Sequence, residues 1–181
     1  MNWKKLQNGS DIRGVALEGI EGENVNLTEE VIMTIGKSFV CWLRKTMGVE
    51  NPTIAVGMDC RLSGNAIKGA FINGAAEAGA NVVDCGLAST PAMFMTTISD
   101  TVKATASVMV TASHLPFNRN GLKFFTPKGG LDSKDIAAIL EIAENGEYAF
   151  DGAKGNATVM DFMSVYSRHI ADYIREGVKA D

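Results

Sequence analysis

The chain has few residues of the kinds that build cross-linked or membrane-embedded proteins. Its 181 residues include three cysteines, four prolines and two histidines. The cysteines are widely spaced and form no C-x-x-C pair, which argues against a disulfide framework or structural zinc and favours reduced thiols. No run of about 18 apolar residues occurs, and no apolar segment of a signal peptide follows Met1–Lys5. We therefore expect a cytoplasmic protein that does not bind a membrane.

Positive charge is scarce as well. Lysine and arginine together number 17, against 21 aspartates and glutamates, which gives a net charge of -4. Because no basic cluster marks a nucleic-acid surface, we expect no nucleic-acid partner, and any phosphate group must bind at a local site. The length is sufficient for one well-cored domain with a fragment of a second.

The chain does contain a regular alternation of strand-like and helix-like segments. Thr28, Ser63 and Thr90 are typical helix caps, Ser133 begins a helical pattern and Gly146 ends it. Because strands that alternate with helices form βαβ units, we predict an α/β fold with a largely parallel sheet. The predicted helices span about 28–47, 64–79, 90–99 and 133–146, and the predicted strands about 53–57, 81–85, 104–110 and 122–126.

The last part of the chain has a different character. A polar, glycine-rich stretch at 146–155 is typical of a domain boundary, and apolar residues then recur at helical spacing over 162–174. One helix cannot bury such a stripe alone, so it either packs on the first domain or opens a second one. We predict a first domain over 1–152, and a linker with the first helix of a truncated second domain over 153–181.

The segment from Val108 to Lys123 combines side chains that could hold a phosphorylated serine. Apolar residues stop at Thr111, so Ser113 and His114 are expected just past the carboxyl end of a strand, where open α/β sheets bind ligands. Ten residues after Ser113 the chain returns with Lys123. A hydroxyl, an imidazole and an ammonium group are thereby brought to one place.

Three further polar clusters lie at expected strand ends or loops, at 10–14, 57–63 and 86–91. In a doubly wound sheet such loops can converge on one edge. Each cluster on its own also has a structural interpretation. These interpretations are a surface ion pair for Asp11 and Arg13, the brace of a turn for Asp59 and Arg61, a turn for Asn120–Gly121, and a structural histidine for His114.

Two other functions agree with less of the sequence. Ser113 beside His114 suggests a serine hydrolase, but adjacent residues in an extended loop tend to point apart, and the nucleophile elbow G-x-S-x-G is missing. The other histidine, His169, lies in the last predicted helix. A nucleotide-binding domain would suit βαβ units, but neither G-x-G-x-x-G nor G-x-x-x-x-G-K-[ST] follows a predicted strand.

Taken together, in order and with their spacing, the four clusters resemble domain I of the α-D-phosphohexomutases, the phosphoglucomutase/phosphomannomutase family. The resemblance covers residues 8–150, and its most specific parts are Thr111-Ala112-Ser113-His114 and Asn120-Gly121-Leu122-Lys123. It implies a three-layer α/β/α domain with a mixed, mostly parallel sheet, and an extra helix at the C-terminal end of this chain.

The resemblance implies a phosphotransferase that interconverts hexose 1-phosphates and hexose 6-phosphates. A phosphoserine at Ser113 would donate its phosphoryl group, a 1,6-bisphosphate would turn over in the site, and the other phosphoryl group would return to Ser113. By the same resemblance, Arg13 and Lys123 are the proton-transfer or positioning groups beside Ser113. His114 would orient the loop or touch the transferred group.

The family uses Mg²⁺, which the serine phosphate and an Asp-Gly-Asp-Gly-Asp-Arg loop of the second domain hold together. That loop does not occur in this sequence, so Ser113 would supply one ligand through its phosphate. We expect the chain to be inactive without domains II to IV of the same polypeptide, with a hexose phosphate as substrate. The alternative is a stand-alone, non-catalytic domain that binds sugar phosphates. Neither the particular hexose nor the oligomeric state follows from the sequence.

One position departs from the family pattern, which commonly has asparagine where Leu115 stands. Because leucine cannot donate or accept a hydrogen bond through its side chain, we expect Leu115 to stabilise the loop by packing with Pro116 and Phe117. Asp59 and Arg61 are expected to hold the loops in place.

Overall fold

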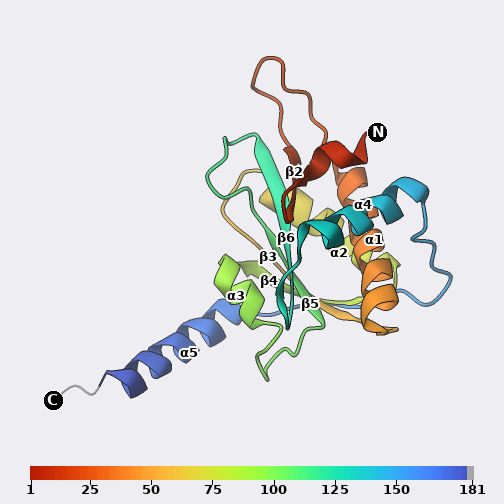
Figure 1. Cartoon of the computed structure of the whole chain (residues 1–181). Coiled ribbons are helices and arrows are strands. Elements are labelled where there is room, and N and C mark those ends of the chain that lie inside the picture. Colours follow the sequence, from red (N-terminus) through yellow and green to blue (C-terminus); the bar gives the residue numbers. More distant parts are fainter. Residues whose placement is uncertain (179–181) are drawn as a thin grey trace.

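A mixed sheet of eight strands forms the centre of the structure, a computed structural model that describes residues 1–178 (Figure 1). The strand order is β1-β2-β6-β5-β3-β4-β8, with β7 paired to β6. The core strands β5, β3, β4 and β8 run parallel, whereas β6 runs antiparallel to β5 and to β2. The strands are β1 (Gln7–Asn8), β2 (Asp11–Val15), β3 (Thr53–Met58), β4 (Asn81–Leu87), β5 (Ala106–Val110), β6 (Arg119–Thr126), β7 (Gly129–Gly130) and β8 (Ala157–Val159).

Helices cover both faces of this sheet, so the predicted three-layer α/β/α fold with a mixed sheet is confirmed (Figure 1). On one face lie α1 (Glu29–Met47), α2 (Gly64–Glu77) and α4 (Ser133–Asn145), and on the other lie α3 (Thr90–Met95) and the start of α5 (Phe162–Gly177). A short 3-10 helix, η1 (Trp3–Leu6), precedes β1. Among these helices, none combines the length and the apolar composition that a membrane crossing requires.

The larger core lies between the sheet and α1, α2 and α4. Phe39, Phe71 and Phe124 are buried there, with ring centroids 4.8 to 6.3 Å apart. Burial of each such ring contributes roughly 1.5 to 3 kcal/mol to the free energy of unfolding. At Gly74 the helices approach so closely that a Cβ atom would stand 2.1 Å from the carbonyl oxygen of Met33. The side chains of this core therefore fill one face of the sheet, and the candidate site residues lie on the other face and at one edge.

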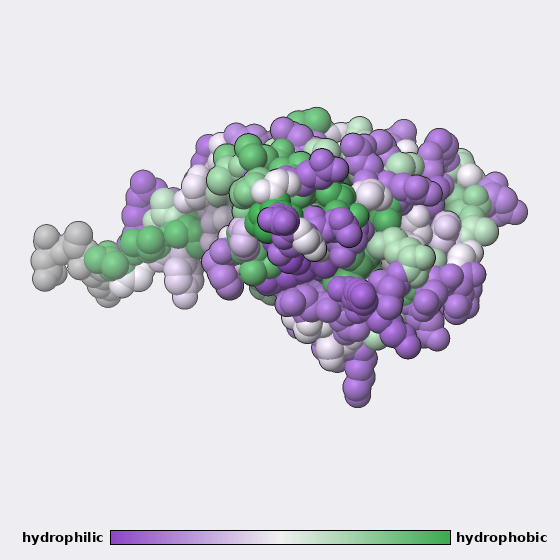
Figure 2. Space-filling model, turned by 90° about the horizontal axis from the view of Figure 1, so that it is seen from above, coloured by the Kyte–Doolittle hydropathy of each residue, from purple (hydrophilic) through white to green (hydrophobic). Residues whose placement is uncertain are grey.

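The smaller core covers the opposite face of the sheet. Met93 from α3, Met109 from β5 and Phe162 from α5 are buried in it. The rest of α5 leaves the body of the molecule, and apolar residues are visible along this projecting helix in Figure 2. Tyr173 and Ile174 are 72% and 55% exposed. The apolar stripe therefore packs into the smaller core at its beginning and is exposed further along.

Strand β8 is an element that the sequence pattern did not predict. Its three residues, 157–159, are all exposed and lie within the segment 153–181 that was expected to be a linker and a helix. They pair in parallel with β4 and place one more strand on the sheet. The boundary at residue 152 stays a prediction.

Two predicted helix starts differ from the structure. The cap of α3 is Ser89 and not Thr90, because Ser89 has the extended backbone of a cap and its hydroxyl accepts a hydrogen bond from the third amide on. This helix ends at Met95, earlier than expected. Ser63 precedes α2 but its backbone is helical and its hydroxyl accepts instead from the side-chain amide of Asn120, at 2.9 Å.

Candidate active site

Three of the four polar clusters meet at the carboxyl edge of the parallel strands. The amide of Ala88, after β4, donates to the carbonyl of Met58 at the end of β3, at 2.8 Å. The amide of Asp59 donates to the carbonyl of Val110 at the end of β5, at 3.0 Å. The serine loop, residues 111–118, follows directly. Three of the polar clusters noted in the sequence therefore lie at this edge.

The remaining polar cluster, at residues 10–14, lies in a strand and not in a loop. Asp11 and Arg13 belong to β2, an interior strand between β1 and β6, and Asn120 and Gly121 belong to β6 and not to a turn. The register pairs Asp11 with Lys123 and Arg13 with Gly121. Because alternate residues of a strand point to the same face, Asp11 and Arg13 share one face of the sheet.

Asp11 joins the two predicted cationic residues. One of its carboxylate oxygens, Oδ2, accepts from Lys123 Nζ at 2.6 Å and from Arg13 Nη2 at 2.8 Å. The side chains of Asp11, Arg13 and Lys123 are only 10%, 16% and 24% exposed. The surface ion pair considered for Asp11 and Arg13 is therefore wrong, since the pair is largely covered and includes a third residue.

Asp11 was not expected to be a site residue. The available signal was the spacing of two positions in Asp11-Ile12-Arg13, which places both charged side chains on one strand face. Nothing in the local pattern indicates Lys123 as the second partner, because it lies 112 residues further on. One carboxylate beside two cations leaves an excess of positive charge, which suits an anionic group.

The backbone register connects Arg13 to the serine loop. The amide of Thr111 donates to the carbonyl of Gly121 at 3.0 Å, and Gly121 is the register partner of Arg13. A Cβ atom at position 121 would stand 2.9 Å from Arg13 Cγ and 2.4 Å from the carbonyl oxygen of Ile12. The Arg13 side chain therefore passes over Gly121, and the carbonyl of Gly121 binds the amide of Thr111. Thr111 lies two positions before Ser113.

Ser113 occupies a strained turn. Its φ of 57° lies in the left-handed region, which costs a residue other than glycine roughly 1 to 2 kcal/mol. Its amide donates to the Thr111 hydroxyl at 2.9 Å, and that hydroxyl donates to Asp59 Oδ2 at 2.6 Å. The side chains of Ser113 and His114 are exposed. Within residues 1–178 neither side chain makes a hydrogen bond, so the loop presents a free hydroxyl and a free imidazole.

Arg61 holds the serine loop from beneath. Its guanidinium donates to four carbonyl groups at 2.8 to 3.0 Å, and its side chain is only 11% exposed. Asp59 fixes the arginine in turn, since its Oδ1 accepts from the Arg61 amide at 3.1 Å. The four carbonyl groups belong to Ser113, Leu115, Pro116 and Arg119.

This arrangement corrects the expectation for Leu115. Pro116 and Phe117 are exposed, and the Phe117 ring, at 52%, lies near Gly19. The backbone carbonyl of Leu115 bonds to Arg61 at 2.8 Å. Main-chain contacts to a buried cation, and not packing among the three apolar side chains, therefore hold the loop.

A second anchor comes from the loop between β2 and α1. Glu23 accepts from Arg119 Nη2 at 2.6 Å and from Asn118 Nδ2 at 2.8 Å. The hydrogen bond from Arg119, followed by that from Asn118, lowers the pKa of the Glu23 carboxyl. Glu23 thus ties residues 16–28 to the end of the serine loop.

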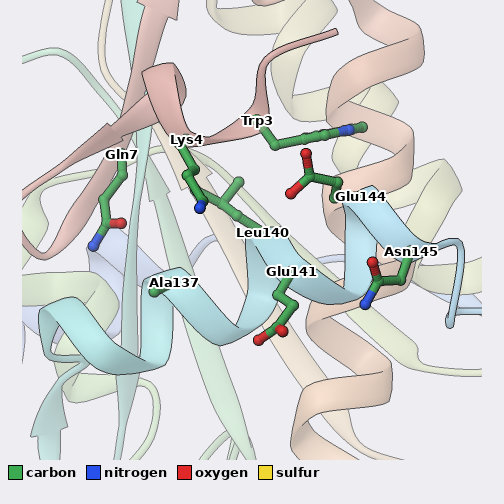
Figure 3. A pocket seen from close by; sticks show the side chains of 8 residues that line it. All are labelled: Trp3, Lys4, Gln7, Ala137, Leu140, Glu141, Glu144 and Asn145. Carbon is green, nitrogen blue, oxygen red and sulfur yellow. The ribbon is translucent and has the colours of Figure 1, made fainter.

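The structure therefore brings Arg13 and Lys123 together and places Ser113 and His114 on the adjoining loop. No hydrogen bond within residues 1–178 joins the side chains of these two pairs. The site is an open edge. The pocket in Figure 3, of about 360 Å³, lies between η1 and α4, where Trp3 and Glu144 are among its lining residues, and it shares no residue with the serine loop.

Comparison with known proteins matches this fold and these motifs to one family. The family model described as "Phosphoglucomutase/phosphomannomutase, alpha/beta/alpha domain I" matches residues 4–149. A crystal structure of a phosphoglucomutase/phosphomannomutase family protein from Burkholderia thailandensis superposes with a TM-score of 0.75 at 25% identity, covering 91% of this chain and 34% of that one.

Curated relatives carry related names. The chain is 36% identical over 137 residues to a phosphoglucomutase/phosphomannomutase of Thermococcus kodakarensis, covering 76% of this chain and 28% of the relative. It is 38% identical over 138 residues to a phosphoglucosamine mutase of Halalkalibacterium halodurans, covering 74% and 28%. A phosphoglucomutase of Neisseria meningitidis is 31% identical over 159 residues, covering 88% and 33%.

This chain spans about a third or less of the length of those relatives. The matched part includes the edge described above, from the Asp11–Arg13 strand through the serine loop to Lys123. The chain belongs to the phosphoglucomutase/phosphomannomutase family, and residues 4–149 correspond to its alpha/beta/alpha domain I.

Proposed function

We propose that this chain is the catalytic-serine domain of a phosphohexomutase, with Ser113 as the carrier of the phosphoryl group. The observation that supports this most directly is the pairing of an exposed serine with two clustered cations. Ser113 stands on a strained turn at the strand edge, and Arg13 and Lys123 lie beside that edge on one shared carboxylate, Asp11. Strained backbone at a ligand-binding edge is characteristic of functional sites.

The proposed reaction has two transfers. In the first, the bond between phosphorus and Ser113 Oγ breaks while a bond forms between phosphorus and a hydroxyl oxygen of the hexose monophosphate, and the proton of that hydroxyl passes to Ser113 Oγ. In the second, the other phosphoryl group of the bisphosphate passes to Ser113 Oγ, and the serine proton passes to the sugar oxygen from which that group leaves. The net change is the isomerisation of a 1-phosphate and a 6-phosphate.

The residues of this edge suit the electrostatic part of this reaction. Phosphoryl transfer depends on positioning and on stabilising charge on the equatorial oxygens. Arg13 and Lys123 supply two cations that Asp11 fixes in place, so they need little rearrangement when the phosphoryl group arrives. We propose that His114, which is adjacent to Ser113 and exposed, contacts the transferred group or orients the loop.

The family is generally Mg²⁺-dependent, and we propose that the whole enzyme requires this ion. Within residues 1–178 no group of three or more carboxylate, histidine or cysteine side chains is placed to hold a metal. Two carboxylates of this region are already engaged, Asp11 by Arg13 and Lys123, and Asp59 by Thr111 and Arg61. The residues present therefore do not form a Mg²⁺ site by themselves. A phosphate on Ser113 would offer oxygen ligands, and the remaining ligands would come from outside the described residues.

The substrate is proposed at the level of a class. The relatives include a phosphoglucomutase and a phosphoglucosamine mutase, whose names differ in the sugar. We therefore propose a hexose phosphate as substrate and the remaining domains of a whole mutase polypeptide as partners. The 181-residue chain is expected to be inactive alone.

The test is a coupled assay of the whole mutase polypeptide with glucose 1-phosphate, mannose 1-phosphate and glucosamine 1-phosphate. Ser113→Ala should remove nearly all turnover, whereas the control Ser133→Ala, at the exposed start of α4, should keep it. Peptide mass analysis should locate phosphate on Ser113. Retention of wild-type turnover by Ser113→Ala would refute the assignment. Binding of sugar phosphates without turnover by the wild type would favour a non-catalytic domain.

A further inference from the structure

The peptide group between Ser113 and His114 has a defined direction. Its carbonyl oxygen accepts from Arg61 Nη2 at 2.8 Å, so the carbonyl points at the guanidinium. No cis peptide bond occurs among the described residues, and in a trans peptide the C=O and N–H bonds point in opposite directions. The N–H of His114 therefore points away from Arg61.

The side of the loop that this N–H faces follows from burial. The Arg61 side chain is only 11% exposed and lies beneath the loop, whereas Ser113 and His114 are exposed. Within residues 1–178 the His114 N–H makes no hydrogen bond to a protein acceptor, although the neighbouring amides of Ser113 and Leu115 are both bonded. An unpaired N–H is thus held on the outer side of the loop, in the residue that follows the serine.

We propose that Arg61 is a positioning residue for phosphoryl transfer. Its hydrogen bond to the Ser113 carbonyl orients the His114 N–H toward the phosphoryl group carried by Ser113. The inference rests on the proposed function of Ser113. A phosphate monoester carries about -1.5 to -2 charge at neutral pH, so a fixed N–H makes a strong, charge-assisted hydrogen bond to it. A donor that is already oriented requires no reorganisation during the transfer.

The Thr111 hydroxyl plays a different part in this geometry. It accepts from the Ser113 amide at 2.9 Å and so fixes the peptide before the serine, whereas Arg61 fixes the peptide after it. Loss of the Thr111 hydroxyl should leave the direction of the His114 N–H unchanged. The two contacts can therefore be separated by substitution.

A matched control exists elsewhere in the chain. Arg44 on α1 also donates to two backbone carbonyls, those of Glu50 at 2.8 Å and Ala78 at 2.7 Å, and both lie outside the serine loop. Arg44→Lys removes the same kind of contact as Arg61→Lys. A general loss of stability should affect both variants, whereas the proposed role belongs to Arg61 alone.

The experiment uses the 181-residue chain with phosphoserine installed at position 113 during synthesis. Two signals are read by NMR: the shift of the His114 amide on phosphorylation, and the second pKa of the phosphoserine from a phosphorus titration. In the wild type we expect a downfield shift of the His114 proton and a second pKa below the value of about 6 for an unconstrained phosphoserine. Arg61→Lys should lose at least half of both effects, and Arg44→Lys should keep them.

A wild-type His114 amide that does not respond to phosphorylation overturns the proposed role of Arg61, and so does an Arg61→Lys chain that keeps both effects in full. If Arg61→Lys loses the fold, the same signals are read in Thr111→Val, where retention of the His114 shift supports the inference and its loss contradicts it. Because the phosphate is installed chemically, failure here is distinct from failure of Ser113 as carrier, which the turnover of Ser113→Ala decides.

Discussion

Lys123 on β6 donates to Asp11 on β2 at 2.6 Å, across two antiparallel strands that are remote in sequence. The same oxygen of Asp11 also binds Arg13. The proposed cations of the site are therefore held by one strand pairing and one carboxylate. Their spacing depends on the register of β2 against β6, and this dependence can be tested by substitution.

Asp11→Asn should lower the turnover of the whole mutase polypeptide by about 10²-fold, because the two cations lose their shared charge and misplacement of positioning groups has effects of this size. The matched control is Asp84→Asn, which removes the carboxylate of the Lys68–Asp84 pair. Both variants should lose some stability in a urea titration. Only Asp11→Asn should lose turnover, and equal turnover in the two variants would contradict the role of Asp11.

Gly121→Ala should lower the free energy of unfolding by about 1 to 3 kcal/mol, as overpacking does, because its Cβ would stand 2.4 Å from the carbonyl oxygen of Ile12. Gly69→Ala, in α2 with open space around the site of a Cβ, should instead gain about 0.5 to 1 kcal/mol. Urea titration of the 181-residue chain measures both. A stabilised Gly121→Ala chain would show that Arg13 is not confined over that glycine.

Ser113→Gly should be more stable than Ser113→Ala by about 1 kcal/mol, because glycine adopts a φ of 57° without the cost that a Cβ imposes. The order should reverse at Ser133, in the first turn of α4, where alanine is favoured over glycine by about 1 kcal/mol. Both Ser113 variants should lack turnover in the whole polypeptide. Equal stabilities of the two Ser113 variants would mean that the turn is not strained.

The Glu23 ion pair should stabilise the chain at neutral pH and lose its effect in acid. Hydrogen bonds from Arg119 and Asn118 lower the pKa of Glu23 from its ordinary 4.5. The stabilisation of the fold by the Glu23 carboxylate is therefore present above pH 4.5 and is lost as the pH falls through the lowered pKa. Glu23→Gln should therefore unfold at lower urea than the wild type at pH 7, with a smaller difference at pH 3. Glu50→Gln, at an exposed position, is the control for the loss of one carboxylate.

Two of the thiols, Cys60 and Cys85, should differ in reactivity. Burial, with the nearby Asp84 carboxylate as a second cause, raises the pKa of Cys85 to about 11, whereas Cys60 is exposed in the loop after β3. At pH 8 a disulfide reagent should therefore modify Cys60 quickly and Cys85 only on unfolding. Cys60→Ser should remove the fast phase. A fast phase that persists in this variant would contradict the assignment.

The sequence was most informative where apolar runs end in polar loops. The strand before Ser113 and the helix after Thr28 follow from local patterns, because burial and capping depend on neighbouring residues. Parallel order could be inferred from the alternation of strands and helices. The placement of Ser113 past a strand end followed from the same reasoning.

Other features depend on contacts that local patterns do not record. β2 is five residues long and carries charged side chains, so the sequence pattern does not indicate a strand there. β8 has three exposed residues and no apolar alternation. Ser63 has the residue type of a cap, yet its hydroxyl accepts from Asn120 on β6, which lies 57 residues away. The bridging position of Asp11 belongs to this group, since only the folded register reveals it.

The reversed direction of β6 has a consequence for how the site assembles. Since β5 and β6 are consecutive and antiparallel, Ser113 and Lys123 belong to one hairpin, and the short connection between them keeps their contacts local in sequence. The distance between Ser113 and Lys123 is then set within this hairpin. Movements elsewhere in a larger polypeptide can change what reaches the serine, but they leave its spacing from Lys123 unaltered.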